Sequence, residues 1–361
     1  MGANSPMKML MMSILAVGAA AVYGQTNAPV PAKPCESHAI LVESLPGSPL
    51  YARRFEDWMT RFHAYLLKAG VPARNILVLC GDKTFKSPIV NGSATTESVC
   101  KAITDIGGRC AEKDQFILIL IGHGSVADMM PSFLLPGPDL TAEDLAKAMA
   151  AVTAGTQVVL NFSGSGGSML KAMTAKGRIN IAATSPEEPS EPVLAEFFLK
   201  ALETGAADGE GAPGKAKDGV VSLLEALNGS SYQTALFISR QRANPEDGTW
   251  DVTGKESVAL FKKLYSGTGT EEGVRAIAAG SDASAADAVV EIVPPTEAGA
   301  ARAWGGRRLV DEHATLEDAG LESGLTPLTT KGYVPIVPAK PDSEGALAAK
   351  TILGRCQPLE K

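Results

Sequence analysis

Residues 38–204 alternate between two hydrophobic patterns, which predict strands and helices in turn. Nearly continuous apolar runs, typical of strands buried on both faces, occupy residues 38–45, 75–80, 114–125, 157–162 and 178–184. Apolar residues at helical spacing occupy residues 53–70, 95–108, 141–152, 169–176 and 192–204. Because repeated units of this kind place strands side by side and helices on both faces, we expect a three-layer α/β/α fold with a mostly parallel sheet.

The two ends of the chain do not follow this alternating pattern. Residues 1–24 carry Lys8, an apolar run and then small residues, which is the order of a secretory signal peptide. The run is shorter than the ~20 apolar residues that a membrane span needs. We therefore expect cleavage after Gly24, a linker at 25–37, and a secreted or periplasmic product with no membrane span after signal cleavage.

The α/β body is predicted to occupy residues 38–243. Residues 244–303 are rich in Ala, Gly and small polar residues and contain one helical pattern at 255–267, so we interpret them as an insertion or linker. Residues 304–361 are predicted to form a C-terminal element followed by an irregular tail.

Charge and cysteine content narrow the class of partner. The net charge is −7 and no dense run of Lys or Arg occurs, which argues against nucleic acid or an anionic membrane surface as the main partner. The five cysteines permit two disulfides with one thiol left over, and buried free thiols are an equally good interpretation. Their spacing matches no zinc signature.

Two of the predicted strands end in residues that can carry chemistry. The strand at 114–125 runs into IGHGS, which contains His123 and Gly124, and the strand at 157–162 runs into NFSGSGG, which contains Ser163 and Ser165. In a doubly wound sheet the functional crevice lies at the carboxyl ends of the strands. We therefore expect His123 and Ser163 to lie side by side at the ends of adjacent parallel strands.

This combination resembles the caspase and legumain-type cysteine peptidases, in which a His-Gly follows one apolar strand and the nucleophilic Cys follows the next. The resemblance extends from the opening HAILVESLPGSPLYARRFEDW to about residue 240, and RLVDEHATLEDAG resembles a C-terminal element of bacterial caspase-like proteins. It implies a caspase-like fold with a dyad of His123, as general base, and Ser163, as nucleophile. The backbone N–H of Gly124 would then help to hold the oxyanion.

The position of the family's catalytic Cys is occupied by Ser163. A thiol paired with His becomes a thiolate near neutral pH, whereas a hydroxyl needs a placed base and an orienting third group. We therefore predict a pseudo-peptidase that binds a peptide or protein in a crevice lined by His123, Gly124, Ser163 and Ser165. The alternative is an active peptidase that uses Ser163 and His123.

A second alternative is a serine esterase of the α/β-hydrolase type. The stretch SGSGG around Ser165 approaches the G-x-S-x-G nucleophile elbow but lacks its first Gly. Such an enzyme needs its His late in the chain, and His313 is the only later histidine.

One further segment has the spacing of a metal site. Asp218, Ser222 and Glu225 reproduce the second half of an EF-hand calcium loop, but Gly214 and Ala216 stand where its first carboxylates belong. The alternative is a capped helix in which Ser222 is the N-cap and Glu225 closes the capping box. We expect no cofactor, and calcium at most as a weak ligand.

Overall fold

The computed structural model describes residues 1–2, 34–184, 186, 192–210, 217–239, 303–304, 307–308, 314–318, 328–329, 332–333, 336, 338, 343 and 345–356. The chain divides into two units, residues 1–34 and 35–361, and the fold belongs to the second unit. The predicted signal peptide beyond residue 2, the helical pattern at 255–267, and His313, Gly214 and Ala216 lie outside the described residues.

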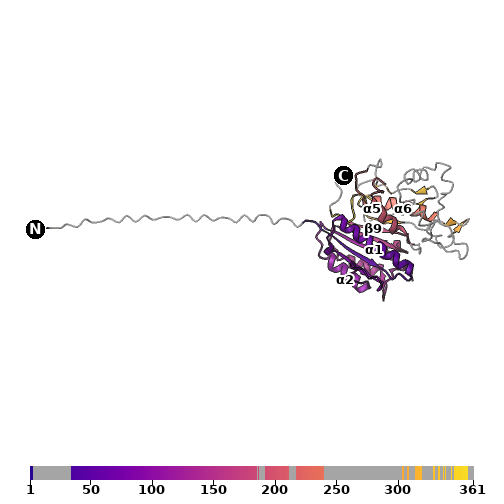
Figure 1. The fold of residues 1–361 in the computed structure, drawn as a ribbon, viewed down its shortest axis with the longest axis horizontal. Coiled ribbons are helices and arrows are strands. Elements are labelled where there is room, and N and C mark those ends of the chain that lie inside the picture. The colour runs from indigo at the N-terminus through magenta and orange to yellow at the C-terminus, as the bar shows by residue number, and fades with distance from the viewer. Residues whose placement is uncertain are drawn as a thin grey trace. The chain divides into compact units, whose positions relative to one another are not determined.

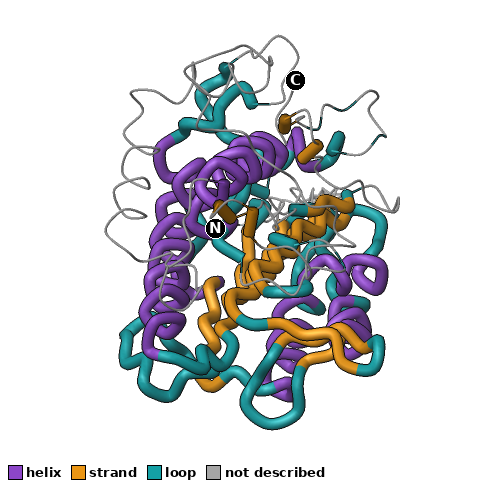
Figure 2. Tube along the Cα trace, turned by 90° about the vertical axis from the view of Figure 1, so that its right-hand side faces the viewer, coloured by secondary structure: helices purple, strands orange, loops and turns teal. Residues whose placement is uncertain are grey.

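A seven-stranded sheet forms the centre of the second unit (Figure 2). Its strands, in spatial order, are β12 (Thr315–Glu317), β9 (Arg178–Ala182), β8 (Thr156–Ser163), β4 (Gln115–Gly122), β1 (Ser37–Glu43), β2 (Ile76–Cys80) and β3 (Gly92–Ser93). All neighbouring pairs are parallel except β12 and β9. The mostly parallel sheet of a three-layer α/β/α fold is thereby confirmed.

Helices cover both faces of this sheet (Figures 1 and 2). They are α1 (Pro49–Ala69), α2 (Thr96–Gly107), α3 (Ala142–Met149), α4 (Leu170–Met173), α5 (Leu194–Thr204) and α6 (Leu223–Ser239), with short 3-10 turns η1 (Ala73–Asn75), η2 (Gly166–Met169) and η5 (Ala348–Lys350). Alternate strand residues pack into two hydrophobic cores, one on each face of the sheet. Ile117 and Ile119 of β4 pack in the core that contains α1, α5 and α6, whereas Phe116 and Leu118 pack in the core that contains α2 and α3.

The helix boundaries follow from local capping. Helix α1 begins before the predicted 53–70 because Ser48 caps it, accepting from Tyr51 N, and proline is tolerated in the first turn. It ends where Gly70 takes φ 100°, a left-handed conformation that favours glycine. Helix α2 begins with a capping box in which Thr95 and Ser98 are reciprocal partners.

The predicted strand at 114–125 is wrong at its end, because β4 stops at Gly122. Gly122 has φ 148°, and a Cβ there would lie 1.9 Å from Ser44 Oγ. After this break the chain forms a three-stranded antiparallel sheet, which the hydrophobic pattern did not predict: β5 (Gly124–Ala127), β6 (Met130–Phe133) and β7 (Leu140–Thr141). Two further pairs are β10 (Ala303–Trp304) with β11 (Arg307–Arg308), and β13 (Leu328–Thr329) with β14 (Gly332–Tyr333).

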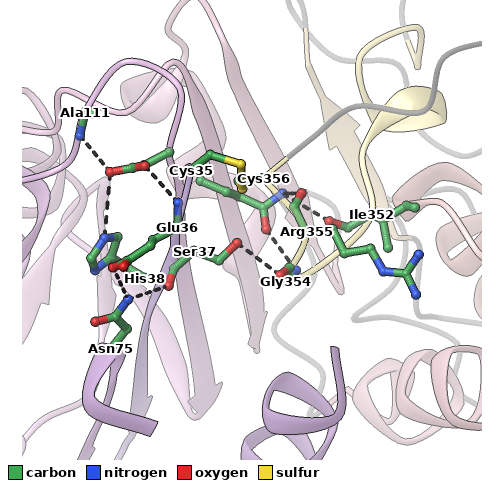
Figure 3. Close-up of a disulfide and its surroundings, with 12 residues drawn as sticks. Cys35, Glu36, Ser37, His38, Asn75, Ala111, Ile352, Gly354, Arg355 and Cys356 are labelled. Carbon is green, nitrogen blue, oxygen red and sulfur yellow. Dashed lines mark hydrogen bonds and ion pairs between the residues drawn. A yellow bond between two sulfur atoms is a disulfide. The ribbon is translucent and has the colours of Figure 1, made fainter. Parts of the chain in front are cut away.

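The C-terminal residues are held against the amino ends of the strands (Figure 3). Cys35 and Cys356 form a disulfide with a Cα–Cα distance of 6.0 Å. Gln115, at the start of β4, donates to Ile352 O and accepts from Gly354 N. The segment that we predicted to be an irregular tail is therefore anchored. The other described cysteines, Cys80, Cys100 and Cys110, are not in a disulfide.

Within the described part of the chain, no helix combines the length and the apolar character that crossing a membrane requires.

Candidate functional site

The strand order reverses at the junction of β1 and β4. From β1 the chain proceeds to β2 and β3 on one side, and from β4 it proceeds to β8 and β9 on the other. Open α/β sheets bind ligands where the strand order reverses in this way, outside the carboxyl ends of the strands. The residues at this switch point are Glu43 to Pro46 and Gly122 to Gly124.

His123 is held by the end of β1. Its backbone N–H donates to Ser44 Oγ at 2.8 Å, and its Nε2 lies 2.9 Å from Pro46 O. A carbonyl oxygen only accepts, so in the neutral imidazole the proton is on Nε2 and Nδ1 is the basic nitrogen. The ring packs edge-on against Tyr51 and Phe55, with centroids 4.7 and 5.2 Å away, so the imidazole lies on the α1 face of the sheet.

Ser163 faces the other way. It is in register with Gly122, and its fully buried hydroxyl donates to Asn161 Oδ1 at 2.6 Å. The Asn161 amide in turn contacts Met169 Sδ at 3.3 Å, in the core that contains α2 and α3. The backbones of His123 and Ser163 are thus neighbours, as adjacent parallel strands require, while their side chains lie on opposite faces of the sheet.

Gly124 packs directly against the turn after β8. A Cβ at this position would lie 2.2 Å from Gly164 O and 2.9 Å from Ser163 Oγ. No other residue type fits without a backbone shift. The glycine to which the resemblance gives the oxyanion role is therefore also required by packing.

Ser165 adopts an unusual backbone conformation. Its φ of 56° and ψ of 16° lie in the left-handed region, and its side chain is buried. Non-glycine residues adopt this region uncommonly, and such conformations gather at functional turns. The turn leads from β8 into η2, as a nucleophile elbow would.

Glu43 is the residue of this site that our sequence reasoning missed. It is 0% exposed, and neither carboxyl oxygen accepts a hydrogen bond of standard geometry. Burial raises the pKa of Glu43 to about 8, a shift that the Cys80 thiol and the Asp82 backbone reduce and that the charges of Asp82 and Glu56 increase. A single acid inside the apolar run HAILVESL was the signal that could have found it.

The structure brings together only two of the three predicted calcium ligands, Ser222 and Glu225, and pairs them with each other. Glu225 accepts from both Ser222 N and Ser222 Oγ at 2.8 Å, and Glu225 N donates back to Ser222 Oγ at 3.3 Å, which is the capping-box geometry at the start of α6. Asp208 instead binds the backbone N–H groups of Asp218 and Gly219. In the described ranges, no group of three His, Cys, Asp or Glu side chains is placed to hold a metal ion.

Fold and site together define an α/β/α protein with a polar site at its switch point. No family model matches the chain, and no curated protein sequence matches it. Among solved structures, the chain is similar to protein GSU0716 from Geobacter sulfurreducens at 12% identity and a TM-score of 0.34, covering 47% of this chain and 83% of that one. This similarity is too low to carry a functional argument, so the caspase and legumain resemblance stays a prediction.

Proposed function

We propose that this chain is a secreted, bacterial caspase/legumain-like domain that binds an extended peptide or protein segment without hydrolysing it. The observation that carries the proposal is the buried Ser163 hydroxyl, which donates to Asn161 on the face opposite the His123 ring. A hydroxyl becomes a nucleophile only when a base lies within hydrogen-bond reach. Pro46 orients the imidazole of His123. The Ser163 hydroxyl lies on the other face of the sheet, so it is not paired with this imidazole as a nucleophile.

The edge position of β5 among the described strands supports a peptide as the ligand. Asp128 and Met129 form a two-residue turn with φ of 50° and 63°, so the flanking residues Ala127 and Met130 are a hydrogen-bonded pair. Alternation then directs the backbone N–H and C=O groups of Gly124 and Val126 away from β6. β5 is at the edge of its sheet, and such an edge adds an extended peptide as a further strand.

The side chains along this hairpin favour an apolar peptide. Val126, Met129 and Met130 are exposed by 46%, 91% and 59%. Exposed apolar side chains that gather in one place mark interaction surfaces, and methionine adapts its shape to different partners.

A hydrolysis assay tests the absence of catalysis. Wild type, Ser163→Ala and Ser163→Cys are compared on a broad peptide library, and we expect no turnover by the wild type. Hydrolysis by the wild type that Ser163→Ala abolishes would overturn the proposal. Activity that appears only in Ser163→Cys would indicate a preserved site that has lost its nucleophile.

A binding assay tests the peptide edge. Val126→Pro removes an outward N–H without removing a bond to β6, because proline is tolerated on edge strands. Apolar peptides selected from a library on the wild type are expected to bind this variant at least about tenfold more weakly. Leu67→Asn is the control, because Leu67 is also an exposed apolar residue but lies in helix α1, where proline would disrupt the fold. Equal binding by Val126→Pro and the wild type would exclude the β5 edge.

The left-handed conformation of Ser165 favours one alternative function, a serine esterase. A fluorophosphonate probe labels activated serines, and labelling of the wild type that Ser165→Ala abolishes but Ser163→Ala retains would support it. No labelling of the wild type would argue against it.

A further inference from the structure

The carboxyl end of β1 is enclosed by close backbone contacts. A Cβ at Gly81 would lie 2.8 Å from the carbonyl carbon and oxygen of Ser44, and a Cβ at Gly122 would lie 1.9 Å from Ser44 Oγ. Ser44 N also donates to Ile121 O, and Gly81 N donates to Glu43 O. This segment therefore has little room to shift while the neighbouring strands keep their places.

Glu43 lies within this enclosed end and has acidic surroundings. It is in register with Cys80 of β2 on one side and with Ile121 of β4 on the other. The titratable groups that act on its carboxyl are the Cys80 thiol, Asp82 of the loop after β2, and Glu56 of α1. None of these groups supplies a positive charge, and the Cys80 thiol and the Asp82 backbone offset only part of the cost of burying a carboxylate.

Two contacts connect Glu43 to the imidazole of the site. Ser44, the next residue, accepts from the backbone N–H of His123, and Pro46, two residues further, lies against its Nε2. Any displacement of the end of β1 therefore moves both groups that hold His123.

We propose that Glu43 is a proton-dependent positioning residue for His123. As a neutral acid it keeps the end of β1 in place, and Ser44 and Pro46 hold the imidazole; its ionisation releases that hold. The proposal rests on the function proposed above only for its consequence, which is that peptide binding at this site weakens when Glu43 ionises.

The direction of the pH effect follows from burial. An ionised carboxylate without a partner is strongly disfavoured in an apolar interior, so Glu43 stays neutral at a pH where exposed glutamates are ionised. Since burial raises the pKa of Glu43 to about 8, the hold on His123 is present at acidic and neutral pH and is lost as the pH rises through that value.

Nuclear magnetic resonance on the full chain tests this without any peptide. The side-chain ¹³C carboxyl signal of Glu43 and the ¹⁵N–H signal of His123 Nε2 are followed from about pH 6 to about pH 10. We expect the Glu43 carboxyl to titrate well above the range of exposed glutamates, and the His123 signal to fall at least about twofold over the same range.

Two variants separate the roles of the neighbouring acids. Glu43→Gln is permanently neutral, so its His123 signal is expected to lose this alkaline transition. Glu56→Gln is the control: it keeps the buried carboxyl and removes one repelling charge, so the transition persists at a lower pH.

Three results would overturn the proposal. They are a Glu43 carboxyl that titrates in the ordinary range, a His123 transition that remains in Glu43→Gln, and wild-type midpoints for the two signals that do not coincide. The comparison of midpoints needs only the wild type, so it decides the matter even when Glu43→Gln fails to fold. Because no peptide is present, failure here is distinct from failure of the peptide-binding proposal.

Discussion

The two ends of the central sheet are built in contrasting ways. At the amino ends, Ser37 and Gln115 are buried and hydrogen-bonded to the C-terminal segment, and a disulfide lies beside them (Figure 3). At the carboxyl ends, Glu43 is buried without a hydrogen bond of standard geometry, and Ser165 has a left-handed backbone. Buried polar groups stabilise a fold only when they are satisfied.

This contrast indicates different roles for the two ends of the sheet. Unsatisfied buried groups and left-handed residues cost free energy, and they persist where the surrounding structure holds them in place. The cross-linked amino end supplies such a hold for the same β1 and β4 strands that carry the site. We infer that the amino end supports stability and that the carboxyl end supports function.

The largest effect on stability is expected from removing the disulfide. Replacing Cys35 and Cys356 together by Ser should lower the free energy of unfolding by about 4 kcal/mol, because the bond closes a very long loop. Chemical denaturation measures the loss, and Cys100→Ser, a free thiol, is the control. A change in the His123 Nε2 signal of the folded double variant would break the proposed separation of the two ends.

Titration of Glu43, which lies at the carboxyl end of the sheet, should have the next largest effect on stability. Its folded pKa of about 8 exceeds the ordinary 4.5, so the unfolded state loses its proton first and stability falls as the pH rises between these values. We expect Glu43→Gln to remove this decline, which amounts to several kcal/mol. Chemical denaturation at several pH values gives the free energies of unfolding of the wild type and of Glu43→Gln. A difference between the two proteins that stays constant with pH would contradict the prediction.

A methyl group at Gly124 should cost about 1–3 kcal/mol, because it would lie 2.2 Å from Gly164 O. Gly92→Ala is the matched control, since its Cβ would meet only Leu79 Cδ2 at 3.4 Å, an ordinary contact. Thermal unfolding of both variants checks the contrast. Equal melting temperatures would mean that the turn after β8 yields easily.

The smallest effect on stability is expected at the hairpin tip. Met129 is 91% exposed with φ 63°, and Asn tolerates that conformation, so Met129→Asn should change stability by less than about 0.5 kcal/mol. Apolar peptides should nevertheless bind about three- to tenfold more weakly, because the variant loses apolar contact area. Fluorescence anisotropy measures this, with Leu67→Asn as the control, and unchanged affinity would place the peptide elsewhere.

The sequence predicted the layers well because burial on both faces leaves long apolar runs that few other structures produce. The runs at 38–45, 75–80, 157–162 and 178–184 all correspond to strands of the sheet. The β5–β6–β7 sheet was missed because the break at Gly122 depends on a positive φ, which the hydrophobic pattern does not record. The antiparallel β12 was missed because a three-residue strand has no measurable periodicity.

For the site, the sequence predicted which strand ends carry polar groups but not which way they point. Ser163 is in register with Gly122, so His123 lies one residue beyond its partner. A shift of one residue along a strand moves a side chain to the opposite face, and register depends on tertiary packing that single strands do not specify. Pro46 was not predicted to orient the imidazole, because its contact with His123 also depends on tertiary packing and in the sequence it is only a turn residue.

The disulfide also changes the topology of the chain. Because Cys35 and Cys356 are joined, the backbone between them forms a closed covalent ring. A single proteolytic cut inside this ring, for example at the exposed tip beside Met129, opens the ring but releases no fragment. Cleaved and intact protein would therefore differ in mass by only one water, and the cleaved protein would come apart into two fragments only after reduction.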